Sequence, residues 1–163
     1  MAAAAAVGGG VTRFARLDEL QAQVGQEIGL SDWMQVDQSR IDLFALASGD
    51  TQWIHTDPAR AAAGPFGTTV AHGFLTLSLL PALFDSAFVI ADVSMGINYG
   101  LNRVRFPAPL PAGSRVRGRF VLRAFEPLPG GAQLTIEATI EREGSSKPVC
   151  AAESVSRCFV ADA

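Results

Sequence analysis

The apolar positions of the chain change their spacing along its length, and each change predicts a new element. A helical repeat over residues 14–24 predicts a first helix that stops at Gly25. The apolar positions of this repeat are Phe14, Leu17, Leu20 and Val24. Alternation over residues 28–36 then predicts a strand that Asp32 interrupts. The apolar residues of one parity in it are Ile28, Leu30, Met34 and Val36.

Two aspartates mark further helix starts. Asp37 is expected to cap a helix that ends before Gly49, with its inward face formed by Ile41, Phe44, Ala45 and Ser48. Asp57 followed by Pro58 has the pattern of a cap and a proline at the first helical position, so one short helix is expected there. The Gly-Pro-Phe-Gly sequence of residues 64–67 then breaks the chain.

The segment from Gly73 to Val89 is the most hydrophobic of the chain and predicts a buried helix that is kinked at Pro81. The rest of the chain alternates as strands, over residues 93–107, 114–125, 132–143 and 147–160. About five strands with one helix inserted after the first predict an α+β fold, in which a long antiparallel sheet wraps around the buried helix. One such sheet leaves its other face uncovered, so a homodimer is expected.

Length and composition are those of one globular domain. The chain has 163 residues, 48% hydrophobic and 18% charged, and we expect a disordered start over residues 1–12 followed by a single domain over 13–163. A net charge of -3 without a basic block argues against a nucleic-acid partner. No apolar run approaches the roughly 18 residues of a membrane span, so no membrane partner is expected.

Two further features of the sequence indicate a cytoplasmic protein. The opening apolar run lacks the charged region and the cleavage site of a signal peptide. Cys150 and Cys158 lie on one predicted strand, roughly 26 Å apart at about 3.3 Å per residue, which is too far for a disulfide. Reduced thiols and no export signal together predict the cytoplasm.

Candidate chemistry gathers between Ser48 and Phe74. Asp50 follows the glycine that ends a helix, and His55 comes five residues later. A carboxylate and an imidazole that lie close together can share one water molecule and move its protons. Taken alone, however, the pair is better explained by a turn-forming aspartate and a partly buried histidine with satisfied hydrogen bonds.

The residues that lead into the hydrophobic helix add a third group. The amide of Gly73 lies at a predicted helix N-terminus, where an unsatisfied N–H suits a developing oxyanion. A tight turn before a helix explains this glycine equally well. His72 could be a ligand or a base, although a structural bond to the loop backbone is the preferred interpretation.

The combined motif S-G-D-x4-H, D-P-x-x-A and A-H-G-F resembles the MaoC-like (R)-specific enoyl-CoA hydratases. The resemblance extends through residues 98–107 and covers the chain from about Asp32 to Phe159. It implies a hot-dog fold, which matches the predicted order of elements, and a place in fatty acid metabolism. It also implies that Asp50 and His55 are the catalytic pair and that Gly73 supplies the oxyanion hole. The implied reaction is syn addition of water to a trans-2-enoyl-CoA, giving an (R)-3-hydroxyacyl-CoA, with the coenzyme A thioester as substrate and no cofactor.

Two departures from the family pattern bear on acyl-chain preference. The usual Asn-Pro between acid and histidine is Gln52-Trp53 here, which keeps an amide and adds bulk at the mouth of the pocket. The serine that some members carry on the central helix aligns with Pro81. Ser78, one turn earlier, is the substitute candidate, although a bond to the preceding turn is its preferred role.

Two rows of arginines alternate along predicted strands. Arg103 and Arg105 could bind the phosphates of coenzyme A or form an ordinary solvated face, with equal weight. A solvated face is the preferred interpretation of the row formed by Arg115, Arg117 and Arg119. The predicted substrate-binding residues are Gln52, Trp53, His72, Ser78, Asn98, Arg103 and Arg105.

Other functions remain open at this stage. The same fold with Asp50 and an oxyanion amide could support an acyl-CoA thioesterase. A non-catalytic acyl-CoA-binding subunit, or a regulatory subunit of a larger dehydratase, is a third possibility. A metal enzyme is disfavoured because two histidines and two distant cysteines offer no ligand spacing.

Overall fold

The second half of the chain forms the sheet on which the other elements pack. The computed structural model describes residues 10–161. Its strands are β1 (Thr12–Phe14), β2 (Glu27–Leu30), β3 (Met34–Val36), β4 (Phe88–Ile90), β5 (Val93–Arg105), β6 (Ser114–Leu128), β7 (Gly131–Arg142) and β8 (Cys150–Val160). Its helices are the 3-10 helix η1 (Leu17–Gln23), α1 (Gln38–Ser48), α2 (Trp53–Thr56), α3 (Pro58–Ala62), α4 (Gly73–Ser78) and α5 (Leu80–Ala87).

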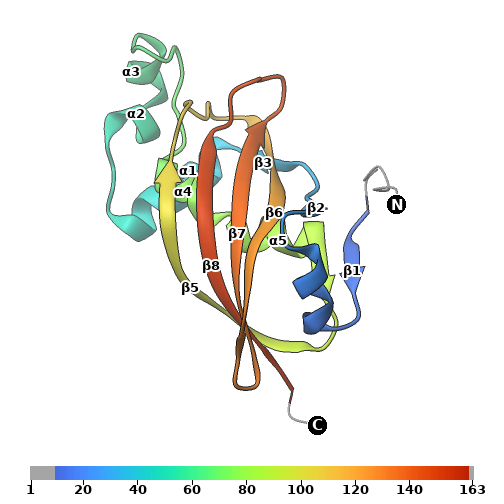
Figure 1. The fold of residues 1–163 in the computed structure, drawn as a ribbon. Coiled ribbons are helices and arrows are strands. Elements are labelled where there is room, and N and C mark those ends of the chain that lie inside the picture. The colour runs from blue at the N-terminus through green and yellow to red at the C-terminus, as the bar shows by residue number, and fades with distance from the viewer. Residues whose placement is uncertain (1–9, 162–163) are drawn as a thin grey trace.

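The main sheet is antiparallel and has six strands. Its order is β2-β6-β7-β8-β5, and β3 pairs with the start of β6. Figure 1 shows this sheet curving in front of α4 and α5, with α5 packed against β6 and β2. This is the α+β arrangement of a hot-dog fold that the sequence predicts. The first predicted strand forms two short strands, β2 and β3, separated at Asp32.

Alternation along β7 explains why the helices cover one face of the sheet. Every second residue of this strand is fully or almost fully buried: Ala132, Leu134, Ile136, Ala138 and Ile140. Successive side chains of a strand point to opposite faces, so the apolar parity forms the core face. On the helix side, Leu83 is fully buried, and Phe84 packs on Phe120 with ring centroids 4.5 Å apart.

The N-terminal segment differs from its predicted helix. Phe14 belongs to β1, which pairs in parallel with β4, and a 3-10 helix starts only at Leu17. The carboxylate of Asp92 accepts the backbone N–H of Leu17 at 2.8 Å, which holds this start in place. Pairing with a distant strand therefore overrides the helical repeat. Residues 1–9 of the predicted disordered start lie outside the described residues, and Thr12 begins a strand.

The helix predicted from Gly73 to Val89 is divided in two. α4 ends at Ser78 and α5 begins at Leu80, directly before Pro81, because proline has no N–H for a continuous helical ladder. α5 ends at Ala87, so Val89 lies in β4. The helix pair is also less enclosed than expected, since Phe74 is 71% exposed.

Both predicted aspartate caps are present. The carboxylate of Asp37 accepts the backbone N–H of Arg40 at 2.9 Å, and this bond lowers the pKa of Asp37 below its ordinary value. α1 ends at Gly49, which has a φ of 79°. Asp57 caps α3 in the same way through Arg60. Ser48 is exposed, however, and does not face inward.

The two cysteines are unpaired, as expected. Cys150 and Cys158 lie on the same strand, β8, and both are buried free thiols. Burial disfavours the thiolate and raises the pKa of Cys150 to about 11. Within residues 10–161, no helix is both long and apolar enough to cross a membrane.

We expect both thiols to be protected in the folded protein. With the pKa of Cys150 at about 11, roughly one molecule in a thousand carries its thiolate at pH 8. A disulfide exchange reagent should therefore find no rapidly reacting thiol in the native protein and two after unfolding in guanidinium chloride. Rapid reaction of either thiol under native conditions would contradict this burial.

Candidate active site

An extended segment, residues 69–72, carries the site between the sheet and a helical overhang, which we define as residues 50–68. Toward the connection between β5 and β6, the N–H of Ala71 donates to the carbonyl of Leu110 at 2.8 Å, and the N–H of Ala112 donates to the carbonyl of Thr69 at 2.9 Å. Toward the overhang, the N–H of Val70 donates to the carbonyl of Ile54 at 3.0 Å. The segment is thus fixed on both sides, and it leads directly into α4.

His55 lies on α2, a one-turn helix of the overhang that the sequence did not predict. His55 is buried, with 7% of its surface exposed, and its Nδ1 lies 2.6 Å from the carbonyl oxygen of Val70. A carbonyl oxygen can only accept, so Nδ1 carries the hydrogen. In the neutral ring Nε2 therefore has a free lone pair, which can accept a proton.

Asp50 lies in the exposed loop that follows Gly49. Its Oδ1 accepts a long hydrogen bond of 3.4 Å from the N–H of Gln52, so the turn that its sequence position suggested is formed. Its own N–H donates to Ser48 Oγ at 3.3 Å. The carboxylate remains accessible to a ligand, because Asp50 is an exposed residue.

His72 connects the two candidate catalytic residues. Its ring stacks on the ring of His55, with centroids 3.7 Å apart and planes inclined by 25°. Nε2 donates to the backbone carbonyl of Asp50 at 2.9 Å, which is the bond to loop backbone that the sequence favoured. His72 is 3% exposed, and its Nδ1 has no hydrogen-bond partner among residues 10–161.

The three side chains lie close enough for shared chemistry. One carboxylate oxygen of Asp50 and one ring nitrogen from each of His55 and His72 lie within 4.8 Å of one another. The stacked rings do not suit a metal ion, because a ligating lone pair lies in its ring plane. An ion about 2 Å from both nitrogens would lie far out of at least one of two nearly parallel planes. The arrangement suits a water molecule instead.

Gly73 is the first residue of α4. Its N–H has no acceptor within the helix, as is general for the first turn. A Cβ at this position would lie 2.7 Å from the ring of Phe106, so close packing requires glycine here. Gly73 and Val70 both line a cavity of about 310 Å³ that Phe106 also borders. A ligand group in that cavity can reach the residue.

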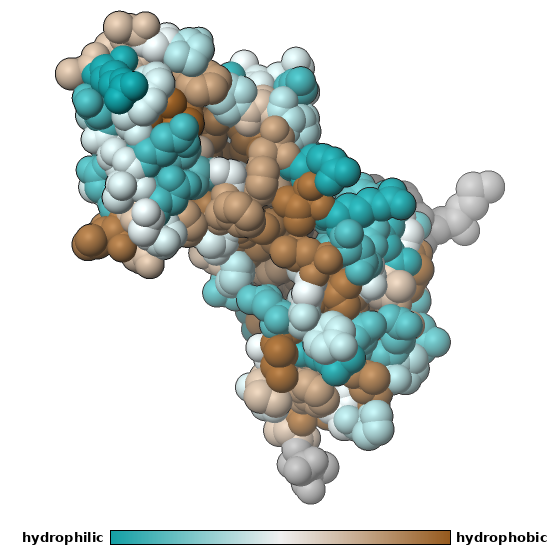
Figure 2. All heavy atoms as spheres, turned by 90° about the vertical axis from the view of Figure 1, so that its left-hand side faces the viewer, coloured by the Kyte–Doolittle hydropathy of each residue, from teal (hydrophilic) through white to brown (hydrophobic). Residues whose placement is uncertain are grey.

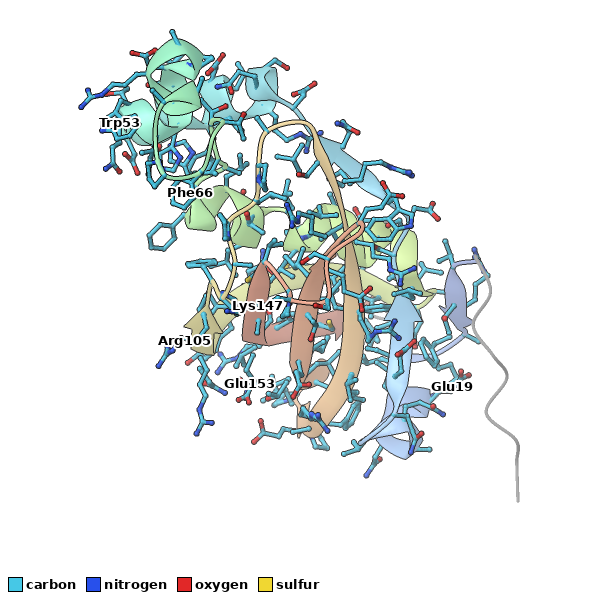
Figure 3. The ribbon with its side chains drawn as sticks, turned by 90° about the horizontal axis from the view of Figure 1, so that it is seen from above. Glu19, Trp53, Phe66, Arg105, Lys147 and Glu153 are labelled. Atoms are coloured by element: carbon cyan, nitrogen blue, oxygen red, sulfur yellow. The ribbon has the colours of Figure 1, made fainter. Side chains whose placement is uncertain are left out.

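Gln52 and Trp53 begin α2. The guanidinium of Arg60 in α3 lies 4.4 Å from the centre of the Trp53 ring. Gly64, just after α3, packs closely against the same ring. Figure 3 shows Trp53 within the overhang, well apart from Arg105. Packing inside the overhang therefore accounts for Trp53. Gln52 is exposed beside Asp50.

Ser78 on α4 and Asn98 on β5 lie close to the same cavity. The hydroxyl of Ser78 donates to the carbonyl of Leu75 at 2.7 Å, the helix-turn bond that the sequence favoured. Both residues line a cavity of about 340 Å³ between the helices and β5. Asn98 and Pro81 also border a neighbouring cavity of about 380 Å³ that ends at Phe84 and other apolar residues.

Both arginine rows lie on strands of the main sheet. Arg103 and Arg105 are exposed near the end of β5, and Arg105 donates to the carbonyl of Val104 at 2.7 Å. The second row forms ion pairs with acidic residues of neighbouring strands, which confirms a solvated face: Arg115 with Glu143, Arg117 with Glu141, and Arg119 with Glu27 and Glu141.

Sequence patterns missed Gln38, the first residue of α1. Its Nε2 donates to the carbonyl of His55 at 2.7 Å, while its Oε1 accepts the hydroxyl of Thr69. One side chain thus ties α1 to both α2 and the 69–72 segment. Nothing in the periodicity of α1 signals this role, because both partners are distant in sequence.

The contact between Gly73 and Phe106 predicts a testable coupling. Gly73→Ala should destabilise the protein by about 1–3 kcal/mol, because its methyl group overlaps the Phe106 ring. Phe106→Ala should destabilise the Gly73→Ala protein much less than it destabilises the wild type, because it also removes the ring that the new methyl group overlaps. Chemical unfolding of the four proteins measures the coupling, and strictly additive effects would contradict the contact.

Comparison with known proteins agrees with this geometry. The family described as MaoC like domain matches residues 19–130. The chain is 54% identical over 145 residues to 3-hydroxyacyl-thioester dehydratase Z of Mycobacterium tuberculosis, covering 88% of this chain and 96% of that protein. It is 49% identical to nodulation protein N of Rhizobium leguminosarum bv. viciae, covering 86% of this chain and 89% of the relative.

Solved structures show the same fold. The structure of R-hydratase PhaJ1 from Pseudomonas aeruginosa matches with a TM-score of 0.69 at 22% identity, covering 91% of this chain and 88% of that one. At this identity the likeness concerns the fold alone. The family assignment rests on the match over residues 19–130 and on the 54% identity to the mycobacterial dehydratase over 145 residues. The chain belongs to the MaoC-like dehydratase family and is a hydro-lyase with a hot-dog fold.

Proposed function

We propose that the protein is an (R)-specific enoyl-CoA hydratase, which adds water to a trans-2-enoyl-CoA and catalyses the reverse dehydration. The observation that carries the proposal is the orientation of His55: its Nδ1 is held by the Val70 carbonyl, and one nitrogen of its ring lies within 4.8 Å of an Asp50 carboxylate oxygen. The Val70 carbonyl holds the ring in the tautomer that a general base needs. A thioesterase would have no evident need for this second, oriented base.

In this mechanism one water molecule lies between the two residues. One of its hydrogens points to His55 Nε2 and the other to the Asp50 carboxylate, which orients the oxygen toward Cβ of the substrate. His55 takes the first proton as the oxygen bonds to Cβ, and the electron pair of the double bond moves toward the thioester carbonyl. The same proton then passes from His55 to Cα on the same face, which gives syn addition and restores the neutral ring.

The Gly73 amide stabilises the negative charge that develops on the thioester oxygen. Its N–H needs no acceptor from its own helix, and Gly73 borders a cavity large enough for the thioester group. The apolar cavities between α4–α5 and β5 offer space for the acyl chain next to Ser78 and Asn98. Exposed Arg103 and Arg105 remain candidates for the phosphates of coenzyme A.

The proposal predicts a loss of chemistry without a loss of fold. Asp50→Asn and His55→Gln should each lower kcat for crotonyl-CoA hydration by about 10²–10⁴-fold, because the first removes the carboxylate charge that orients the water and the second removes the base that takes its proton. Loss of enoyl absorbance measures the rate, and circular dichroism checks the fold. Asp18→Asn is the matched control, since Asp18 is an exposed carboxylate paired with Arg16 far from the site.

The same assay separates the alternatives. Near-normal hydration by both site variants would rule out the assigned pair. Release of free coenzyme A from saturated and unsaturated substrates alike, without hydration, would identify a thioesterase. Binding of acyl-CoA without any turnover would identify a non-catalytic subunit.

We also propose that the active form is a homodimer paired through β5. This strand lies at the edge of the main sheet, and nearly its whole length is exposed. Figure 2 looks toward this side and shows hydrophobic surface running across the middle of the molecule. The exposed apolar residues of β5 are Met95, Ile97, Tyr99 and Leu101. A long apolar edge strand is a template for another strand, and a second copy would cover it.

The dimer proposal predicts a change in mass. Met95→Glu and Ile97→Glu should shift the protein from dimer to monomer in light scattering, because each buries a charge in the paired interface. Val24→Glu makes the same kind of change at another exposed apolar residue and should leave the dimer intact. A monomeric wild-type protein at micromolar concentration would contradict the proposal.

A further inference from the structure

His72 occupies a position from which it can set the geometry of the whole site. We infer that it is a positioning residue for the proposed hydration, one that fixes the distance between the Asp50 loop and the His55 ring. The inference rests on the proposed function, and it assigns to His72 a role other than contact with substrate. Three structural observations support it.

The first observation is the hydrogen bond to the Asp50 loop. His72 Nε2 lies 2.9 Å from the backbone carbonyl of Asp50, so Nε2 carries the hydrogen. Asp50 has few other restraints in its exposed loop: its N–H and Oδ1 make bonds of 3.3 and 3.4 Å to near neighbours in sequence. The bond from His72 is the shorter one, and it ties the loop to a buried side chain.

The second observation is the stack on the base. The rings of His72 and His55 are 3.7 Å apart, and Phe44 of α1 packs on the His72 ring at 5.0 Å. Nearly parallel contact between two buried rings leaves little freedom for either ring to tilt. His72 thereby restrains His55 laterally, while the Val70 carbonyl restrains it at Nδ1.

The third observation is the place of His72 in the chain. It directly precedes Gly73, and its carbonyl accepts the N–H of Thr76 at 3.1 Å in the first turn of α4. Its backbone therefore moves only with the helix that carries the proposed oxyanion donor. Through one residue, the acid loop, the base and the oxyanion amide share a common frame.

The unpartnered nitrogen shows why this residue is a histidine. With the hydrogen on Nε2, the neutral ring leaves Nδ1 as an acceptor that finds no donor among residues 10–161. A buried polar atom without a partner costs free energy. A phenyl ring would keep the stack without that cost, so stacking alone does not explain the histidine. The N–H that His72 donates to the Asp50 carbonyl explains it.

Paired substitutions separate the donor from the stack. His72→Phe keeps an aromatic ring and removes the N–H, so it should lower kcat by about 10- to 100-fold with KM within about twofold of wild type. His72→Gln keeps an N–H donor of similar reach and should recover most of that loss. Leu83→Ala, a fully buried site on α5, controls for general destabilisation and should leave kcat per folded molecule unchanged.

Histidine-selective nuclear magnetic resonance tests the geometry in the wild-type protein. The chain has two histidines, so only two imidazoles contribute signals. At a pH of about 8, where unperturbed imidazole is neutral, we expect opposite tautomers: the hydrogen on Nδ1 of His55 and on Nε2 of His72. This measurement does not depend on whether a variant folds.

The outcomes distinguish the two proposals. If wild type hydrates enoyl-CoA and His72→Phe retains kcat within twofold, the positioning role is wrong and the proposed function stands. A hydrogen on Nδ1 of His72 would also overturn it, whatever the variants do. If wild type hydrates no enoyl thioester while the two tautomers are as expected, the proposed function fails and the restraint on the Asp50 loop remains.

Discussion

Backbone hydrogen bonds on both sides of residues 69–72 are the constraint on which the site depends. They hold the segment between Leu110 and Ile54, so that its carbonyl at Val70 points at His55 and its end starts α4. On one side the partners lie in the connection between β5 and β6, and Leu110 in that connection is buried in the core. The buried ring of His55 is then placed by a backbone carbonyl of this segment rather than by a flexible side chain.

Much of the fold follows from the sequence because it depends on local signals. The aspartate caps, Gly49 and the alternation of β7 are each set within a few residues. The failures lie where distant segments meet. β1 pairs with β4, and this pairing determines the conformation of Phe14 more strongly than its own helical repeat does. The interruption between α4 and α5 was placed near Pro81, but Leu79 is the residue where it occurs.

The site divides in the same way. Motif spacing brought forward Asp50, His55 and Gly73, and the fold places them around one segment. No spacing could reveal that His55 would stack on His72, because sixteen residues, most of them in the overhang, lie between them and the contact depends on how the overhang folds back. Gln38 was missed for the same reason. Trp53 drew attention as a departure from the family pattern, yet Arg60 and Gly64 account for its ring.

The Val70 carbonyl has one more consequence for the proposed reaction. When the His55 ring is neutral, as the proposed base requires, its bond to this carbonyl joins two neutral groups. Once the ring has accepted a proton from water, the same N–H belongs to an imidazolium, and hydrogen bonds from a charged donor are about twice as strong. The bond therefore favours the transient cation over the resting ring, and such differential stabilisation lowers a barrier. In many acid–base sites a carboxylate has this task. A peptide carbonyl performs it without competing for the proton.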